Sequence, residues 1–138
     1  MLLISDQTRV NNAVAFTASP LTSRTYDASQ TVIFDVVLTN IGAAFDPEES
    51  VFTCPVTGLY LFSITIHASA GQAAEVQIEK QGISLVQTYT ESIHTAANMA
   101  FVQCAAGEGV SVKTQNFDDQ EMYADFYSTF SGMLVSIL

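Results

Sequence analysis

Positive charge is scarce in this sequence, and charge of either sign is low. Lys and Arg together number 4 against 14 Asp and Glu, so the formal net charge is −10, and charged residues make up only 13% of the 138 positions. Arg9, Arg24, Lys80 and Lys113 stand singly, so no sequence neighbours form a basic patch. Such an acidic surface repels phosphate backbones and anionic lipid, which argues against nucleic-acid binding. The low charge content favours an assembly that hides part of the surface.

Long apolar runs are absent as well. No run approaches the length of a membrane span, and Met1–Ile4 is too short for the apolar core of a signal peptide. We therefore predict no membrane insertion, and we expect the signal peptide of a secreted protein to lie outside this sequence. Neither a Gly-X-Y repeat nor helical periodicity of useful length occurs, so the sequence contains no collagen stalk and predicts one domain built from strands.

The side chains that carry most enzyme chemistry are equally few. His67 and His94 are the only histidines, and Cys54 and Cys104 are the only cysteines. Neither histidine has a second His or Cys at the spacing of metal ligands, and neither cysteine has a base near it, as a nucleophile needs. No Ser-His-Asp arrangement and no glycine-rich phosphate loop before a helix can be assembled. We predict that the chain is not an enzyme.

The clearest structural pattern is a strict alternation that begins at Gly58 and runs to Ala68. Its even positions are large and apolar, as expected of a strand with one face in a core, and they are Tyr60, Phe62, Ile64 and Ile66. Its odd positions begin apolar and end polar, in the order Leu59, Leu61, Ser63, Thr65 and His67. We infer that another subunit covers the outer face of this strand at its apolar end.

Other segments alternate in the same way between turn-forming residues. The predicted elements are a strand at 13–16, a loop at 20–30, a strand at 31–38, a turn at 40–42, an acidic loop at 45–49 and an apolar final strand that includes Leu134, Val135, Ile137 and Leu138. Two hairpins are expected, one joining 75–79 to 83–87 through Gln81 and Gly82, the other joining 99–104 to 110–113 through 107–109. The apolar residues at the end of the chain must be buried, because an open apolar edge would aggregate.

Aromatic, Asn and Gly residues recur at fixed distances in the first half of the chain. The pattern runs Phe34, five residues, Asn40, four residues, Phe45, six residues, Phe52, five residues, Gly58, one residue, Tyr60, one residue, Phe62. It resembles the signature of the complement C1q globular-head domain, a family of the tumour necrosis factor-like superfamily. One departure is Ile64, where an aromatic residue is more usual. A second resemblance lies at 123–134, which contains Phe130 and Gly132, so the resemblance covers essentially the whole chain.

This resemblance implies an all-β, ten-stranded, antiparallel two-sheet jelly roll over residues 12–138, after an N-terminal segment at 1–11, and a compact homotrimer. In that arrangement the strand after Gly58 lies beside the strand ending near Cys104. A disulfide between Cys54 and Cys104 is therefore expected, with two buried free thiols as the alternative. The aromatic residues are expected in the core or at subunit interfaces, namely Phe16, Phe34, Phe45, Phe52, Tyr60, Phe62, Phe101, Phe126 and Phe130.

The function that the resemblance implies is that of a secreted, non-enzymatic recognition module. Its loops and inter-subunit grooves would bind a protein, a microbial surface, a glycan or a small anionic ligand in innate immunity. A cytokine-like signalling ligand for a cell-surface receptor and a trimerisation head of a longer chain are the alternatives. The fold is shared by these functions, so the sequence does not decide between them.

Calcium is the one ion that the resemblance suggests, and no other cofactor is expected. Several relatives hold calcium near the trimer axis with an Asp just after a Tyr that resembles Tyr89, whereas this chain has Thr90 there, followed by Glu91. The candidate metal ligands are Glu91, Asp118, Asp119 and Glu121, and the candidate ligand-binding residues are His94, Glu91, Asp118 and Asp119. Because an EF-hand spacing is absent, a solvated acidic loop is the favoured interpretation of the cluster formed by Asp118, Asp119, Glu121 and Asp125.

Overall fold

The computed structural model describes residues 13–138, and the predicted N-terminal segment at 1–11 lies outside the described residues. Every named element in the described range is a β-strand, which confirms the all-β prediction. The same residues contain no helix that is long and apolar enough to cross a membrane.

Residues 13–138 form twelve strands, two more than the ten predicted. In chain order they are β1 (Ala15–Ser19), β2 (Arg24–Tyr26), β3 (Val36–Ile41), β4 (Phe45–Asp46), β5 (Val51–Thr53), β6 (Gly58–His67), β7 (Ala73–Lys80), β8 (Ile83–Glu91), β9 (Thr95–Cys104), β10 (Gly109–Thr114), β11 (Gln120–Met122) and β12 (Thr129–Ile137).

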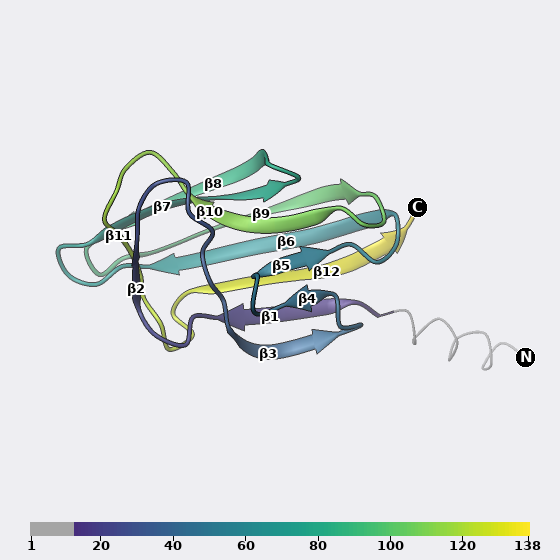
Figure 1. Cartoon of the computed structure of the whole chain (residues 1–138), viewed down its shortest axis with the longest axis horizontal. Coiled ribbons are helices and arrows are strands. Elements are labelled where there is room, and N and C mark those ends of the chain that lie inside the picture. Colours follow the sequence, from purple (N-terminus) through teal and green to yellow (C-terminus); the bar gives the residue numbers. More distant parts are fainter. Residues whose placement is uncertain (1–12) are drawn as a thin grey trace, which may run out of the picture.

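Ten of the strands build two five-stranded antiparallel sheets, the two layers of the sandwich in Figure 1. The first sheet has the order β3-β1-β12-β6-β9, and the second has the order β4-β5-β10-β7-β8. The other two strands, β2 and β11, pair with each other as a short ribbon at the end of the sandwich far from the C-terminus. The two-sheet jelly roll is thus confirmed, and this ribbon is additional to the ten strands of the two sheets. Phe45 and Asp46 were predicted as part of a loop but form β4.

Strand β6 corresponds to the segment with strictly alternating apolar residues that begins at Gly58. Its even residues are buried between the sheets and its odd residues are only partly covered, as the period of two requires. It lies between β12 and β9, and Gly58 at its start pairs with Cys104 at the end of β9. The predicted neighbour of β6 is therefore confirmed.

Of the two predicted hairpins, one is confirmed and one is wrong. Strands β7 and β8 pair across Gln81 and Gly82, and Gly82 has the positive φ of 78° that favours glycine in such a turn. Strands β9 and β10 do not pair with each other, because β9 belongs to the first sheet and β10 to the second. The turn at 105–108 crosses between the sheets, where the N–H of Gly107 donates to the carbonyl of Cys54.

The strand predicted at 31–38 is only partly correct, because the observed strand begins and ends later in the sequence. Thr31 forms only an isolated bridge with Lys113, and the regular strand β3 begins at Val36. This strand includes Asn40 and Ile41 of the predicted turn, whereas Gly42 forms a turn with a positive φ of 87°. The Asn40 side chain fixes the residues that follow this turn. The Asn40 amide donates to the carbonyl of Phe45 at 2.9 Å and accepts the N–H of Phe45 at 3.2 Å.

The apolar end of the last strand is not buried within one chain. Residues 124–127 form turns, and β12 starts at Thr129. Of the residues predicted to be buried, Val135, Ile137 and Leu138 are exposed on this chain, whereas Leu134 is partly buried against the core. The reason is that β12 lies inside the first sheet between β1 and β6, so burial is available on one of its faces only.

The core between the sheets is made of packed aromatic rings. The ring of Phe16 stacks on those of Phe45 and Phe52, with centroids 4.6 and 5.1 Å apart, and meets Phe130 edge to face at 4.9 Å. Seven of the nine aromatic residues predicted for the core or interfaces are fully buried here. The other two, Phe101 and Phe126, are exposed on this chain.

Gly132 is required by this ring packing. A Cβ at this position would lie 2.6 Å from a ring carbon of Phe16 and 2.6 Å from one of Phe62, closer than real Cβ atoms approach. Gly58 is under the same constraint, with a Cβ placed 2.7 Å from the carbonyl oxygen of Ser136. At both positions glycine is therefore required, because neighbouring atoms lie too close to leave room for a Cβ.

We predict that Gly132→Ala destabilises the fold by roughly 1–3 kcal/mol, because the added methyl group forces core rings out of their packed positions. Urea denaturation of the variant measures the change. Gly109→Ala is the matched control, since the nearest neighbour of its added methyl group would be a side-chain methyl of Val51 at 3.2 Å, farther away than the ring carbons at 2.6 Å. Equal stability of the Gly132 variant and the wild type would contradict the packing described.

Candidate functional site

The outer face of the first sheet carries a row of apolar side chains, several of them exposed. One row of residues in register crosses all five strands, from β3 through β1, β12 and β6 to β9. We call this set the apolar row, and it consists of Ile41, Ala15, Met133, Leu61 and Phe101. Ile41, Met133 and Phe101 are exposed, and Phe101 has 67% of its surface open. Exposed apolar side chains that run together across a sheet mark a contact surface.

The next row on the same face is hydroxyl-bearing over four strands. It consists of Thr39, Thr17, Ser131 and Ser63, and it ends at Met99 on β9. The hydroxyls of Thr17 and Ser131 hydrogen-bond to each other at 2.8 Å. Since these side chains are short, they leave a depression of about 280 Å³ between the rows, lined in part by Ala15, Leu61 and Met133.

The face thus changes from apolar to polar along the strands. Beyond the hydroxyl row, Thr129 pairs with Thr65, and His67 closes β6 opposite Thr95. The odd positions of β6 had indicated this change. The residues that β3, β1, β12 and β9 add to each row were not evident in the sequence, because register between distant strands leaves no local pattern.

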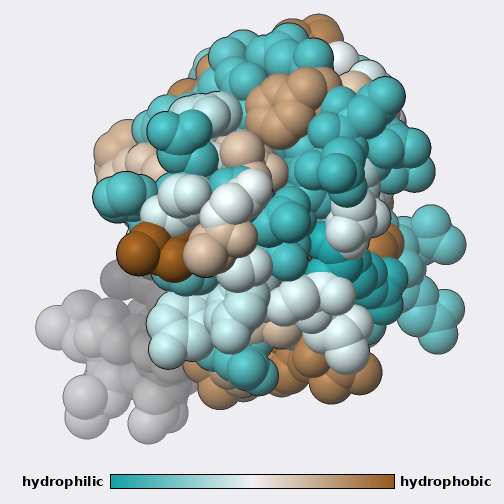
Figure 2. All heavy atoms as spheres, turned by 90° about the vertical axis from the view of Figure 1, so that its left-hand side faces the viewer, coloured by the Kyte–Doolittle hydropathy of each residue, from teal (hydrophilic) through white to brown (hydrophobic). Residues whose placement is uncertain are grey.

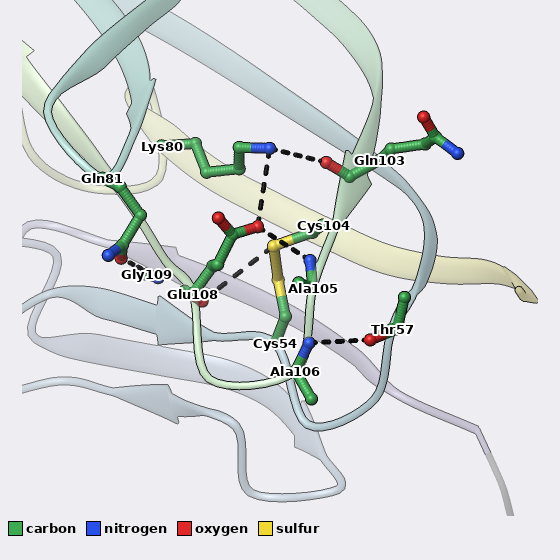
Figure 3. Close-up of polar contacts among 10 residues, drawn as sticks. All are labelled: Cys54, Thr57, Lys80, Gln81, Gln103, Cys104, Ala105, Ala106, Glu108 and Gly109. Carbon is green, nitrogen blue, oxygen red and sulfur yellow. Dashed lines mark hydrogen bonds and ion pairs between the residues drawn. A yellow bond between two sulfur atoms is a disulfide. The ribbon is translucent and has the colours of Figure 1, made fainter.

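The end of the sandwich nearest the C-terminus holds the disulfide (Figure 3). Cys54 and Cys104 are bonded, with their Cα atoms 6.4 Å apart, and both are buried. The bond ties the segment before β6 to the end of β9, where the chain crosses from one sheet to the other. The chain crosses between the sheets twice here, from β5 to β6 and from β9 to β10, and the disulfide links the two crossings.

A charged pair lies beside the disulfide (Figure 3). The Lys80 ammonium donates to the carbonyl of Gln103 at 2.8 Å and lies 3.5 Å from a carboxylate oxygen of Glu108. The same carboxylate accepts the N–H of Ala105 at 2.8 Å. This hydrogen bond is the main cause that lowers the pKa of Glu108 below its ordinary value; desolvation opposes it, and Lys80 adds to it. At a pH above the ordinary pKa of Glu, the ionised Glu108 therefore stabilises the turn. This stabilisation is lost as the pH falls through the lowered pKa of Glu108 in the folded protein.

The predicted metal and ligand residues lie at the opposite end of the molecule, and the side chains of four of the five have separate contacts. Asp119 is the fifth, and its backbone N–H donates to the Asp27 carboxylate. Glu91 accepts the Tyr89 hydroxyl, and a His94 ring nitrogen bonds the carbonyl of Glu91. Asp118 accepts the N–H of Ala28, and Glu121 accepts the N–H of Ser69. Among residues 13–138 there is no group of three or more His, Cys, Asp or Glu side chains placed to hold a metal ion.

A ring cluster that the sequence analysis did not single out lies at the same end. His67 packs against Tyr123 and Tyr127, with ring centroids 5.4 and 5.2 Å away. The two tyrosine rings are 5.5 Å apart. Only the crowding of aromatic residues at 123–127 hinted at this cluster, since His67 is more than fifty positions away in the sequence.

Comparison with known proteins identifies the family and the fold. The model of the C1q domain family matches residues 15–135. Mouse (Mus musculus) collagen alpha-1(X) chain is 31% identical over 129 residues, which are 88% of this chain and 18% of that protein. The chain thus spans less than a fifth of the length of this relative.

Solved structures share the fold at low identity. The globular domain of zebrafish complement 1qA has a TM-score of 0.74 at 16% identity, over 90% of this chain and 98% of that one. Murine APRIL has a TM-score of 0.66 at 12% identity, over 90% and 100%. Eiger TNF from S. frugiperda has a TM-score of 0.64 at 15% identity, over 91% and 93%.

We predict that replacing both cysteines, Cys54→Ala with Cys104→Ala, lowers the free energy of unfolding by about 4 kcal/mol, because the bond closes a loop of 50 residues in the unfolded chain. Urea denaturation measures the loss. Wild type unfolded in the presence of a reductant should lose a similar amount. An unchanged unfolding midpoint in both experiments would show that the bond does not form.

Proposed function

Because this chain belongs to the C1q domain family, we propose that it is a secreted, non-enzymatic recognition module that acts as a homotrimer. Members of this family are in general binding modules without catalytic activity. The proposal is that the trimer binds a protein, glycan or microbial-surface ligand in innate immunity. It requires no cofactor.

The observation that carries the proposal is the exposed apolar row on the first sheet. An apolar side chain gains about 1.5–3 kcal/mol when it is fully buried, and this row leaves Ile41, Met133 and Phe101 in water. The chain also carries a net charge of −10, which by itself favours separation of identical copies. An apolar contact surface offers the association energy that must exceed this repulsion.

The depression beside the apolar row supports contact with a second copy. It is lined by short side chains, and its volume of about 280 Å³ would accept one large side chain. Phe101 is the most exposed member of the apolar row and lies on β9, the edge strand of the same sheet. We propose that Phe101 of each copy packs on the outer face of the next copy.

If the outer face is covered in this way, the surfaces left for a ligand are the loops at the ends of the sandwich. Connecting loops carry specificity in many folds, because a rigid scaffold positions them. The end with the ribbon of β2 and β11 gathers most of these loops, and Figure 2 shows that it is mainly hydrophilic. We place the recognition surface there.

We predict that Phe101→Ser reduces the mass in solution from that of three chains to that of one, because it removes the largest exposed apolar side chain of the row. Light scattering measures the mass of wild type and variant at the same concentration. Ile83→Ser is the matched control, since Ile83 is also 67% exposed but lies on β8 in the second sheet. A wild type of one chain, or a Phe101 variant that remains at three, would contradict the proposed assembly.

We predict further that labelled trimer binds killed bacteria saturably and does not bind receptor-bearing animal cells. Flow cytometry with both targets in parallel measures this. Saturable binding to animal cells alone would contradict the immune role and favour a cytokine-like ligand. Binding to neither target would favour a trimerisation head of a longer chain.

A further inference from the structure

The ring cluster of His67, Tyr123 and Tyr127 closes the polar end of the outer face. Tyr127 is 55% exposed, and the neighbouring Asp125 and Phe126 are exposed as well. His67 lies at the end of β6, on the left in Figure 1, next to the loop that leads into β12. The cluster thus presents an aromatic surface to solvent with a carboxylate in the same short segment.

The loop that carries this surface is held in place by four hydrogen bonds to other parts of the chain. The N–H groups of Ala124 and Phe126 donate to the hydroxyls of Ser23 and Ser19, each at 3.1 Å. The N–H of Tyr123 donates to the carbonyl of His67, and the N–H of His67 donates to the Ser128 hydroxyl. Asp125 and Phe126 keep a positive φ of 60° and 63° under these constraints. Such strained conformations persist where the surroundings fix them, as they do at many binding sites.

The phenol groups of the cluster are available to a ligand. Of the five tyrosines, Tyr26, Tyr60 and Tyr89 use their hydroxyls in hydrogen bonds to Ile33, Val56 and Glu91. The hydroxyls of Tyr123 and Tyr127 have no such partner within residues 13–138. One ring nitrogen of His67 bonds the Thr95 hydroxyl at 2.8 Å, which orients the imidazole against the two phenol rings.

The charge around the cluster is negative. Each Lys and Arg in the described range already lies within 3.5 Å of a carboxylate oxygen, so none is left to balance other acidic groups. The loops at this end carry six carboxylates outside these pairs, namely Asp27, Glu91, Asp118, Asp119, Glu121 and Asp125. A negative field over exposed aromatic faces attracts cations and repels phosphate, sulfate and anionic lipid.

We propose that Tyr123, Tyr127 and Asp125 form a binding site for a cationic side chain, Arg or Lys, in an exposed basic segment of a partner protein. The cation lies over a tyrosine face, where the ring quadrupole attracts it, and donates hydrogen bonds to the Asp125 carboxylate and a phenol oxygen. The inference rests on the proposed recognition role, since it names the ligand chemistry of the loop end, but it does not require three chains.

The test measures the affinity of a dye-labelled peptide of alternating Gly and Arg for the whole chain by fluorescence anisotropy. Tyr127→Ala should weaken binding roughly tenfold, about the free energy of one cation–π contact with its hydrogen bond. Tyr89→Ala is the matched control and should bind as wild type, because Tyr89 is similarly exposed (49%) and also has a carboxylate beside it. Tyr127→Phe, which keeps the ring, should retain most of the affinity.

The contribution of charge is separated by two further variants. Asp125→Asn should weaken binding, whereas Glu49→Gln, which makes the same change in net charge on the β4–β5 loop, should not. Equal loss in both would show a general attraction to an acidic surface and overturn the site. The proposed site would also be overturned if the peptide does not bind, or if Tyr127→Ala binds it as tightly as wild type. Binding of a neutral oligosaccharide in place of the peptide would overturn it as well.

Light scattering and thermal melting of the same variants distinguish this failure from failure of the proposed function. Tyr127 is more than half exposed, so the variants should fold and keep the mass of the wild type. Loss of peptide binding at unchanged mass supports the site. A wild type that binds the peptide as a single chain would support the site while contradicting the trimer.

Discussion

The fold depends on the packing of Phe16 against the opposite sheet. Phe16 belongs to β1 in the first sheet, and its ring stacks on Phe45 and Phe52 of the second sheet at 4.6 and 5.1 Å. Rings this close leave no room for a side chain on the adjacent strand β12, which is why Gly132 stands there. Because strands alternate, fixing the inward residues of β1, β12 and β6 also fixes which residues face outward. The core thus determines the position of the apolar row without determining its composition.

The outer face and the two ends of the sandwich differ in the interactions that they contain. At one end the disulfide and the Lys80–Glu108 pair hold the two crossings between the sheets. At the other end the ribbon of β2 and β11 and the loops around it are held by hydrogen bonds that backbone N–H groups donate to side-chain oxygens. Between them lies the face with the apolar row. A contact along this face would leave the loop end open, so assembly and recognition can use different surfaces of one small domain.

Much of the fold could be predicted from the sequence, because the residues of the pattern are the ones that the core constrains. Phe34, Phe45, Phe52 and Phe62 are all buried, and Asn40 bonds the backbone of Phe45. The second hairpin was wrong because alternation shows where a strand lies, not which sheet it joins. The apolar row was missed for a similar reason, since it combines residues from five strands. The acidic candidates were chosen for closeness in sequence, whereas the fold gives Asp118 and Glu121 separate backbone partners, Ala28 and Ser69.

The same reasoning explains why family membership does not identify the ligand. The pattern residues are inside the protein, and a ligand meets only the loops and outer faces, where sequences of one fold are free to differ. A site for a single cationic side chain is weak, because an exposed cation–π contact contributes only about 0.5–1 kcal/mol. If three copies assemble through the apolar row, three such sites lie on one particle, and a partner that presents several cations meets the second and third at a high effective concentration. The apolar row would then determine both the assembly and whether the weak sites at the loop end bind a partner tightly enough to hold it. The two surfaces would act together although no residue belongs to both.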